Sequence, residues 1–217
     1  MIVCSLITQV CKISPRWASR VLASYWARSS LLPTPACVKV IGRGHIQQGQ
    51  SYIVVANHIS QYDILALYGW LDIDLKWVMK EELRKVPTLG TACDAMGHVF
   101  IDRSKPKAAA AALKKGQDEL KPGESLIFFP EGSRSENGVT GGFKRGAFVT
   151  AKELNLPILP VTVKGTETIL PSNTLDLMPG TVEITIHPPI SQTTVETSNA
   201  TQLRSLSRDA VISALSD

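Results

Sequence analysis

Short apolar runs recur along the chain and alternate with stretches of helical periodicity. The runs have the length and composition of buried strands, and they cover Cys37–Ile41, Tyr52–Ala56, Leu75–Met79, His98–Ile101, Ser125–Phe129, Ile158–Val163 and Val182–His187. Helical patterns cover Ile64–Trp70, Glu81–Met96, Lys107–Leu120, Phe143–Leu154 and, near the end, Gln202–Leu215. Strands that alternate with helices predict an α/β fold, in which an open, mainly parallel mixed sheet is flanked by helices.

The first thirty residues have the spacing of amphipathic helices. Apolar side chains recur every three or four positions, at Val3, Leu6, Val10, Ile13, Trp17 and Val21. Basic side chains occupy another side, at Lys12, Arg16 and Arg20. Ser14 followed by Pro15 is typical of an N-cap and a first helical position, so we predict an N-terminal amphipathic helical pair rather than one long helix.

Charge is distributed unevenly between the N-terminal segment and the rest of the 217-residue chain. Residues 1–62 contain six basic residues and no Asp or Glu, whereas the remainder contains 17 basic and 19 acidic residues. A basic, acid-free helical pair that carries Trp17, Tyr25 and Trp26 favours association with an anionic membrane surface. The alternative is a pair that packs on its own domain with a solvated basic face. We expect membrane-associating helices at 1–33 and an α/β domain at 34–217.

The sequence disfavours several other classes of protein. It has no run of about eighteen apolar residues, so no transmembrane helix is evident. Its four cysteines have no CxxC spacing, so we expect neither a disulfide framework nor a zinc site, and a reducing compartment. The start fits a cleaved signal peptide poorly, because no basic residue precedes its apolar stretch. Neither GxxxxGK[ST] nor GxGxxG is present, so nucleotide binding of those types has no support.

The polar residues after each apolar run are candidates for chemistry, because ligands of an open α/β sheet bind beyond the carboxyl ends of its strands. His58 and Asp63 follow Tyr52–Ala56. On one helix they would lie about 140° apart, but they can meet if His58 lies in the turn and the helix begins near Gln61. A carboxylate that holds one ring nitrogen lets the other take a proton from a hydroxyl. Alternatively, Asp63 is only a capping acid, with Ser60 as N-cap, and His58 only a turn residue.

A second polar cluster follows the run that ends at Phe129 and consists of Glu131, Gly132, Ser133 and Arg134. Arg is the preferred partner for bidentate binding of phosphate, and Arg103 adds a second guanidinium after another predicted strand. The alternative is that both arginines pair with nearby acids. Ser133 lacks the GxSxG surroundings of an exposed nucleophile, so we reject it as the attacking group.

Further basic residues lie near the ends of predicted elements, at Lys80, Lys144 and Arg145. Each can help to bind phosphate, although such residues are more often simply solvated.

Four blocks of the sequence, in order, resemble the motifs of the glycerolipid acyltransferases, typified by the 1-acylglycerol-3-phosphate (lysophosphatidic acid) acyltransferases. Residues 57–63 look like the NHxxxxD motif, 97–103 like the second block, 129–135 like FPEGTRS and 156–161 like the fourth block. The blocks lie within roughly half of the chain. Ser133 stands where the family usually has Thr, which keeps the hydroxyl group.

The resemblance implies a reaction and a role for each candidate. His58 would be the general base that takes the proton of the acceptor hydroxyl, and Asp63 would orient its imidazole. The phosphate and glycerol part of the acceptor would be held by Arg103, Glu131, Gly132, Ser133 and Arg134, with Lys80 facing the phosphate as well. Neither a metal nor any other cofactor is expected.

The resemblance also implies partners and a location. The acyl donor would be acyl-CoA or acyl-carrier protein, and the acceptor a lysophospholipid, 1-acyl-sn-glycerol-3-phosphate, which becomes phosphatidic acid in phospholipid biosynthesis. The enzyme would sit on an anionic membrane surface, at the cytoplasmic face of the inner (plasma) membrane, and would bind no nucleic acid. Alternatives are the same chemistry on glycerol-3-phosphate or a lyso-aminolipid, a thioester hydrolase in which His58 activates water, and a lipid-binding protein without activity.

Overall fold

The computed structural model describes residues 2–11, 13–31, 34, 36–134, 140–171 and 176–215. In these residues one sheet contains the seven strands β1 (Ala36–Ile41), β2 (Ile53–Ala56), β3 (Asp74–Lys80), β4 (Val99–Ile101), β5 (Glu124–Phe128), β6 (Ile158–Lys164) and β7 (Gly180–Ile186). The strand order is β1-β7-β6-β2-β5-β3-β4. Neighbouring strands are parallel except β6 and β7, which are antiparallel. The prediction of a mainly parallel mixed sheet is confirmed.

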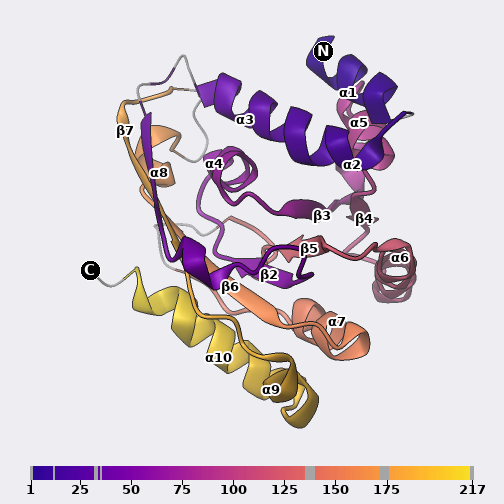
Figure 1. Cartoon of the computed structure of the whole chain (residues 1–217), viewed down its shortest axis with the longest axis vertical. Coiled ribbons are helices and arrows are strands. Elements are labelled where there is room, and N and C mark those ends of the chain that lie inside the picture. Colours follow the sequence, from indigo (N-terminus) through magenta and orange to yellow (C-terminus); the bar gives the residue numbers. More distant parts are fainter. Residues whose placement is uncertain are drawn as a thin grey trace.

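Helices cover both faces of the sheet (Figure 1). One face carries α6 (Pro106–Glu119), α7 (Gly146–Leu154), α9 (Gln192–Thr197) and α10 (Ala200–Ser213). The other carries α1 (Ile2–Cys11), α2 (Pro15–Trp17), α3 (Ala23–Leu31), α4 (Tyr62–Trp70) and α5 (Leu89–Ala95). The shorter elements are η1 (Ala18–Leu22), η2 (Arg43–His45), η3 (Glu81–Lys85) and α8 (Thr166–Ile169).

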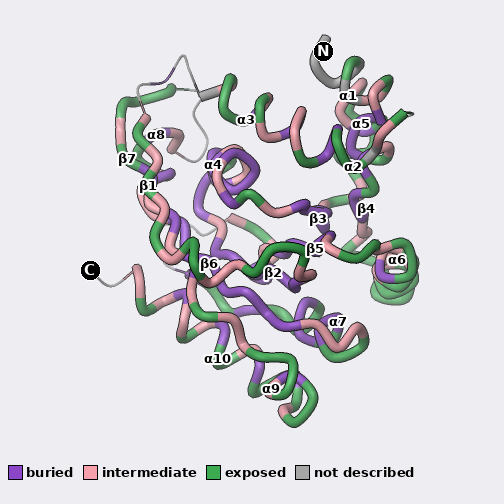
Figure 2. Tube along the Cα trace, viewed as in Figure 1, coloured by how far each residue is buried: buried purple, intermediate pink, exposed green. Residues whose placement is uncertain are grey.

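The central strand β2 shows why these strands are continuously apolar. All four of its residues are buried, as expected for a parallel strand between two helical layers. Ile53 and Val55 belong to the hydrophobic cluster under α7 and α10, whereas Val54 and Ala56 belong to the cluster under α4 and the N-terminal helices. Burial is concentrated in the central strands and on the inner sides of the helices (Figure 2).

The predicted helix Glu81–Met96 is wrong as a single element. The structure divides it into η3, a 3-10 helix, and α5. Pro87 is the physical reason, because proline disfavours the α conformation of the residue before it and has no N–H for an internal helical bond. Val86 is accordingly extended, with φ −72° and ψ 119°. The helix predicted at Phe143–Leu154 begins three residues later, at Gly146.

The second N-terminal helical stretch packs closely on the domain. It runs from Pro15 to Leu31 and includes a π-helical segment, η1. Its buried side is formed by small residues, Ala18, Ala23 and Ala27, which let the backbone approach α4 and β3. Ser24 Oγ donates to the Tyr68 carbonyl oxygen at 3.0 Å. These contacts place the helix over the sheet edge that carries the site described below.

A buried cluster of charged and polar groups joins the same helix to the sheet. Lys76 Nζ lies 3.2 Å from Asp74 Oδ1 and 3.5 Å from Glu124 Oε1. Ser19 Oγ, from η1, donates to Asp74 Oδ1 at 2.6 Å. Because buried charges are stable only when they are paired and hydrogen-bonded, this cluster specifies how the N-terminal helix docks.

Other apolar side chains of the N-terminal helices point into solvent. Ile13 is 87% exposed, Tyr25 69%, Leu6 53% and Trp17 49%. Figure 2 shows exposed stretches along α1, α2 and α3. Across the described residues, every helix is too short or too polar to cross a bilayer.

Among the described residues, Arg16, Arg28 and Arg43 of the basic N-terminal segment are bound within the chain. Arg16 donates to the Pro122 carbonyl oxygen. Arg28 donates to the Gly69 carbonyl oxygen at 2.7 Å, and both Arg28 and Arg43 form ion pairs with Asp72. Part of the basic charge predicted for a membrane surface therefore holds the helix on the domain.

Candidate active site

The topology brings the polar residues after five strands to one edge of the sheet. Strands β6, β2, β5, β3 and β4 run parallel to one another, so their carboxyl ends lie together. His58 follows β2, Glu131 follows β5, and Arg103 follows β4. Lys80 is the last residue of β3.

His58 and Asp63 meet through the turn after β2, as the sequence allowed. His58 Nδ1 lies 2.9 Å from Asp63 Oδ2. The same Asp63 oxygen accepts the backbone N–H groups of Ile59 at 2.7 Å and Ser60 at 2.9 Å. The helix begins at Tyr62, one residue later than predicted. Asp63 thus both holds the histidine and caps the turn, so the two interpretations of this residue are compatible.

The hydrogen bonds of Asp63 determine the tautomer of His58. Asp63 Oδ2 already accepts two backbone N–H groups, so an ionised carboxylate can only accept from His58 as well. His58 Nδ1 therefore carries the hydrogen, and Nε2 has the lone pair. The His58 side chain is 15% exposed and Asp63 is fully buried. A ring held in this way can take a proton from a hydroxyl group in the adjoining pocket.

Thr166 completes the support of Asp63, and sequence reasoning missed it. Its hydroxyl donates to Asp63 Oδ1. Thr166 begins α8, directly after β6, so the rule that selected the other candidates also applies to it. A nearby amide fixes the adjoining strands, since Asn57 bonds both the N–H and the carbonyl oxygen of Val163 at 2.8 Å.

Phe129 sets the plane of the imidazole. The His58 and Phe129 rings are stacked, with centroids 3.9 Å apart and an interplanar angle of 7°. Trp77 in turn packs against Phe129, with their ring centroids 5.4 Å apart. The position of Phe129 after β5 was visible in the sequence, but its contact with His58 depends on the pairing of β2 with β5.

Glu131 contacts the backbone that carries His58. One carboxylate oxygen accepts the His58 N–H at 2.8 Å, and the other accepts the Gly141 N–H at 2.8 Å. The residue is 8% exposed and, unlike its neighbours Gly132, Ser133 and Arg134, does not line the pocket. Its carboxylate therefore connects the His58 turn to the segment before α7.

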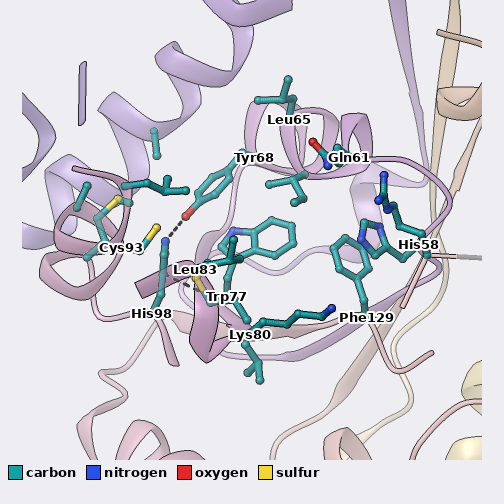
Figure 3. A pocket seen from close by; sticks show the side chains of 18 of the residues that line it. His58, Gln61, Leu65, Tyr68, Trp77, Lys80, Leu83, Cys93, His98 and Phe129 are labelled. Atoms are coloured by element: carbon teal, nitrogen blue, oxygen red, sulfur yellow. Dashed lines mark hydrogen bonds between the residues drawn. The ribbon is translucent and has the colours of Figure 1, made fainter. Parts of the chain in front are cut away.

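A pocket of about 740 Å³ extends from His58 between α3, α4, α5 and the end of β3. Its size is within the range of about 300–1,000 Å³ that is usual for ligand pockets. Most of its lining is apolar, with Ala23 and Trp26 supplied by the N-terminal helix. Figure 3 shows His58 and Phe129 at one end and His98, Tyr68 and Cys93 at the other.

Three cations in the described ranges of the chain line the pocket. Lys80, Arg103 and Arg134 line it together with Gly132 and Ser133, and Lys80 extends toward Phe129 in Figure 3. Within the part of the chain that the structure describes, none of these three cations is in an ion pair. Desolvation lowers the pKa of the Arg103 guanidinium, and the Glu82 carboxylate opposes that effect. Among the described residues, the alternative in which the arginines pair with nearby acids is not observed, and the site has the charge for an anion.

The inner end of the pocket contains a different histidine. His98 Nδ1 accepts the Trp77 backbone N–H at 3.3 Å, so Nε2 carries the hydrogen and lies 2.5 Å from the Tyr68 hydroxyl. Burial, together with the positive charge of Lys76, lowers the pKa of His98 to about 3. His98 is therefore neutral at physiological pH. Among the described residues, no three His, Cys, Asp or Glu side chains are grouped so that they could hold a metal ion.

The fold and the site place the chain among the acyltransferases. The family model described as Acyltransferase matches residues 37–164, more than half of the chain, and the chain belongs to this family. The match covers His58, Asp63, Arg103 and the 131–134 turn.

Two similar proteins have the same enzyme name. The chain is 34% identical over 202 residues to the 1-acyl-sn-glycerol-3-phosphate acyltransferase of Chlamydomonas reinhardtii, covering 92% of this chain and 59% of the relative. It is 34% identical over 171 residues to the chloroplastic enzyme LPAT1 of Arabidopsis thaliana, covering 78% of this chain and 48% of the relative. The chain thus spans about half to three fifths of the length of these relatives.

A solved structure has the same fold. The crystal structure of the 1-acyl-sn-glycerophosphate acyltransferase PlsC from Thermotoga maritima matches with a TM-score of 0.79 and 29% sequence identity. The match covers 92% of this chain and 79% of the other.

Proposed function

We propose that the protein transfers a fatty acyl group from a thioester donor to the free hydroxyl of 1-acyl-sn-glycerol-3-phosphate, which yields phosphatidic acid. The observation that carries the proposal is the His58–Asp63 pair at the cationic end of a largely apolar pocket. The names of the relatives support the choice of acceptor. His58 and Asp63 are the proposed catalytic residues.

The reaction follows from the tautomer of His58. Nε2 accepts the proton of the acceptor hydroxyl as that oxygen attacks the carbonyl carbon of the thioester. The tetrahedral intermediate then breaks its carbon–sulfur bond, and the thiolate takes the proton back from Nε2. The Asp63 carboxylate stabilises the imidazolium between these two steps. The new ester and the free thiol account for all atoms, and no acyl-enzyme is needed.

The two ends of the pocket have the chemistry of the two parts of a lipid substrate. Arg103, Arg134 and Lys80 can bind the phosphate of the acceptor, because a guanidinium matches phosphate oxygens in bidentate fashion and an ammonium adds a point charge. The apolar lining beyond Trp77 accommodates a fatty acyl chain. The donor is either acyl-CoA or acyl-carrier protein.

We also propose that the protein acts at an anionic membrane surface, at the cytoplasmic face of the inner membrane. The exposed Ile13, Trp17 and Tyr25 side chains of the N-terminal helices support this location, because apolar and aromatic side chains insert at the interface of a bilayer. Arg20 is exposed as well and adds attraction to anionic headgroups.

An acyl-transfer assay tests the function. Labelled oleoyl-CoA and palmitoyl-carrier protein are offered as donors, with lysophosphatidic acid, glycerol-3-phosphate or a lyso-aminolipid as acceptors. We expect phosphatidic acid from wild type and none from His58→Ala. Product from only another acceptor would retain the chemistry and overturn the substrate. Free fatty acid formed without any acceptor would identify a thioester hydrolase, and the absence of every product would overturn the proposal.

Vesicle sedimentation tests the location. Wild type should pellet with vesicles that contain phosphatidylglycerol, and an Ile13→Ser/Trp17→Ser double variant should remain largely in the supernatant. Leu206→Ser is the matched control, since Leu206 is 47% exposed on the far helix α10. Equal pelleting of the double variant would contradict the proposed membrane contact. Point variants are preferable to truncation, because Ala23 and Trp26 line the pocket.

A further inference from the structure

The backbone of Lys144 is held beside the turn that follows β5. Lys144 donates its N–H to the Pro130 carbonyl oxygen at 2.8 Å. The preceding residue, Phe143, is buried and stacks on Phe148 with a centroid distance of 6.4 Å. These contacts hold the backbone of Lys144 next to the Glu131–Arg134 turn.

The Lys144 side chain extends across Gly132. A Cβ atom built at Gly132 would lie 2.4 Å from Lys144 Nζ, 2.9 Å from Cε and 3.2 Å from Cδ. Gly132 also has a positive φ of 83°, which favours glycine over any residue with a side chain. The glycine thus leaves space for the lysine. The ammonium group lies beside Gly132, which lines the pocket, and Lys144 itself is outside the lining.

The ammonium group of Lys144 is a charge without an ion pair in the described part of the chain. Two lysines on α6 differ in this respect, since Lys114 pairs with Asp118 and Lys115 with Glu119. Glu131, the acid of this turn, accepts the backbone N–H groups of His58 and Gly141. Lys144 therefore adds positive charge beside Gly132, in the turn that also carries Arg134.

We propose that Lys144 is a further phosphate-positioning residue of the acceptor site and that Gly132 is glycine in order to leave room for it. This inference rests on the proposed acyl transfer to a phosphate-bearing acceptor. Lys144 and Arg134 approach the phosphate from two sides of the Gly132 backbone and hold the acceptor hydroxyl toward His58. A doubly charged phosphate monoester is the ligand class that such a pair of cations fits best.

Binding of glycerol-3-phosphate to the full chain tests the proposal without requiring turnover. Isothermal titration compares wild type with Lys144→Met, which keeps an unbranched side chain without the terminal ammonium, and with Lys144→Arg, which restores a cation. Because hydrogen bonds between charged groups are strong, Lys144→Met should weaken binding roughly tenfold, and Lys144→Arg should recover most of the loss. Lys107→Met is the matched control, an exposed lysine of α6 that should bind as wild type does.

Kinetics with lysophosphatidic acid separate positioning from a structural role. Lys144→Met should raise the KM for the acceptor roughly tenfold and change kcat much less, with unchanged thermal unfolding. Gly132→Ala should also raise this KM, and its additional effect should be smaller in the Lys144→Met background, because the ammonium it displaces is already absent.

Several results would overturn the role of Lys144. The first is that Lys144→Met binds glycerol-3-phosphate as tightly as wild type does. The second is that wild type does not bind it. The third is that Lys107→Met loses as much affinity as Lys144→Met. Failure of the proposed function is distinguishable, because wild type would then bind glycerol-3-phosphate in a Lys144-dependent manner and still form no acylated product.

Discussion

The two histidines of the pocket lie in opposite electrostatic surroundings. His58 contacts a carboxylate, Asp63, and its side chain is partly exposed. His98 is buried, hydrogen-bonded to the neutral Tyr68 hydroxyl, and close to the positive charge of Lys76. Burial and the positive charge of Lys76 oppose protonation of the His98 ring. Asp63 instead holds Nδ1 of His58 and leaves Nε2 facing the pocket side. The comparison teaches that the neighbouring charge, and not the presence of an imidazole in the pocket, selects the residue that can exchange a proton.

The largest expected effect separates the two histidines by activity. His58→Ala should lower kcat by about 10³-fold or more, because it removes the general base. His98→Gln should lower kcat by only a few fold, since Gln can still donate to Tyr68. Steady-state acyl-transfer rates measure both variants. A comparable loss in the two would contradict the assignment of the base.

A slightly smaller effect is expected when the charge beside His58 is removed. Asp63→Asn keeps the size of the side chain and loses the negative charge that stabilises the imidazolium, so kcat should fall about 10²–10³-fold. Thr166→Val is the comparison variant. It removes one hydrogen bond to Asp63 and retains the charge, so its effect should be tenfold or less. Activity of Asp63→Asn close to wild type would show that this residue only caps the turn.

A third prediction concerns Glu131, which accepts the backbone N–H of His58. In Glu131→Gln, one of the two backbone N–H groups faces an amide NH₂, which repels it. We expect kcat to fall roughly tenfold through misplacement of His58, with little change in the acceptor KM. Initial rates over a range of lysophosphatidic acid concentrations separate the two constants. A rise in KM alone would instead support direct binding of substrate by Glu131.

The last prediction concerns stability at acid pH and not activity, and it belongs to the His98 end. The unfolded chain binds a proton at an ordinary histidine pKa of about 6.5, whereas folded His98 has a pKa of about 3. Between these values the unfolded state holds more protons, so the free energy of unfolding should fall by about 1.4 kcal/mol for each pH unit of acidification from this group. The loss begins below pH 6.5.

Urea unfolding of wild type and His98→Gln at pH 7, 6, 5 and 4 measures this contribution. Burial also lowers the pKa of His187, so that group contributes with the same sign in both proteins. The difference between wild type and His98→Gln should therefore change steadily in favour of the variant as pH falls. An equal pH dependence in the two proteins would contradict a neutral, buried His98.

The sequence by itself determined the seven strands and the residues that follow them. A continuous apolar run indicates a strand that is buried on both faces of the sheet, and this pattern is a local property of each strand. The turn after β2 is also local. It allowed a contact between His58 and Asp63, which are five residues apart, and the resemblance to the family implied that contact. The division of Glu81–Met96 was equally local, since Pro87 was visible, but the helical periodicity around it outweighed that signal.

Only the tertiary structure decided what surrounds this pair. The strand order places β2 between β5 and β6, and it thereby brings Phe129, Glu131 and Thr166 to His58 and Asp63 from as far as 103 positions away in sequence. It also places the N-terminal helix as a wall of the pocket, with Arg28 bound to the domain. Such contacts depend on which strands pair and on the close packing of helices, and one chain's pattern of apolar and polar residues does not contain that information.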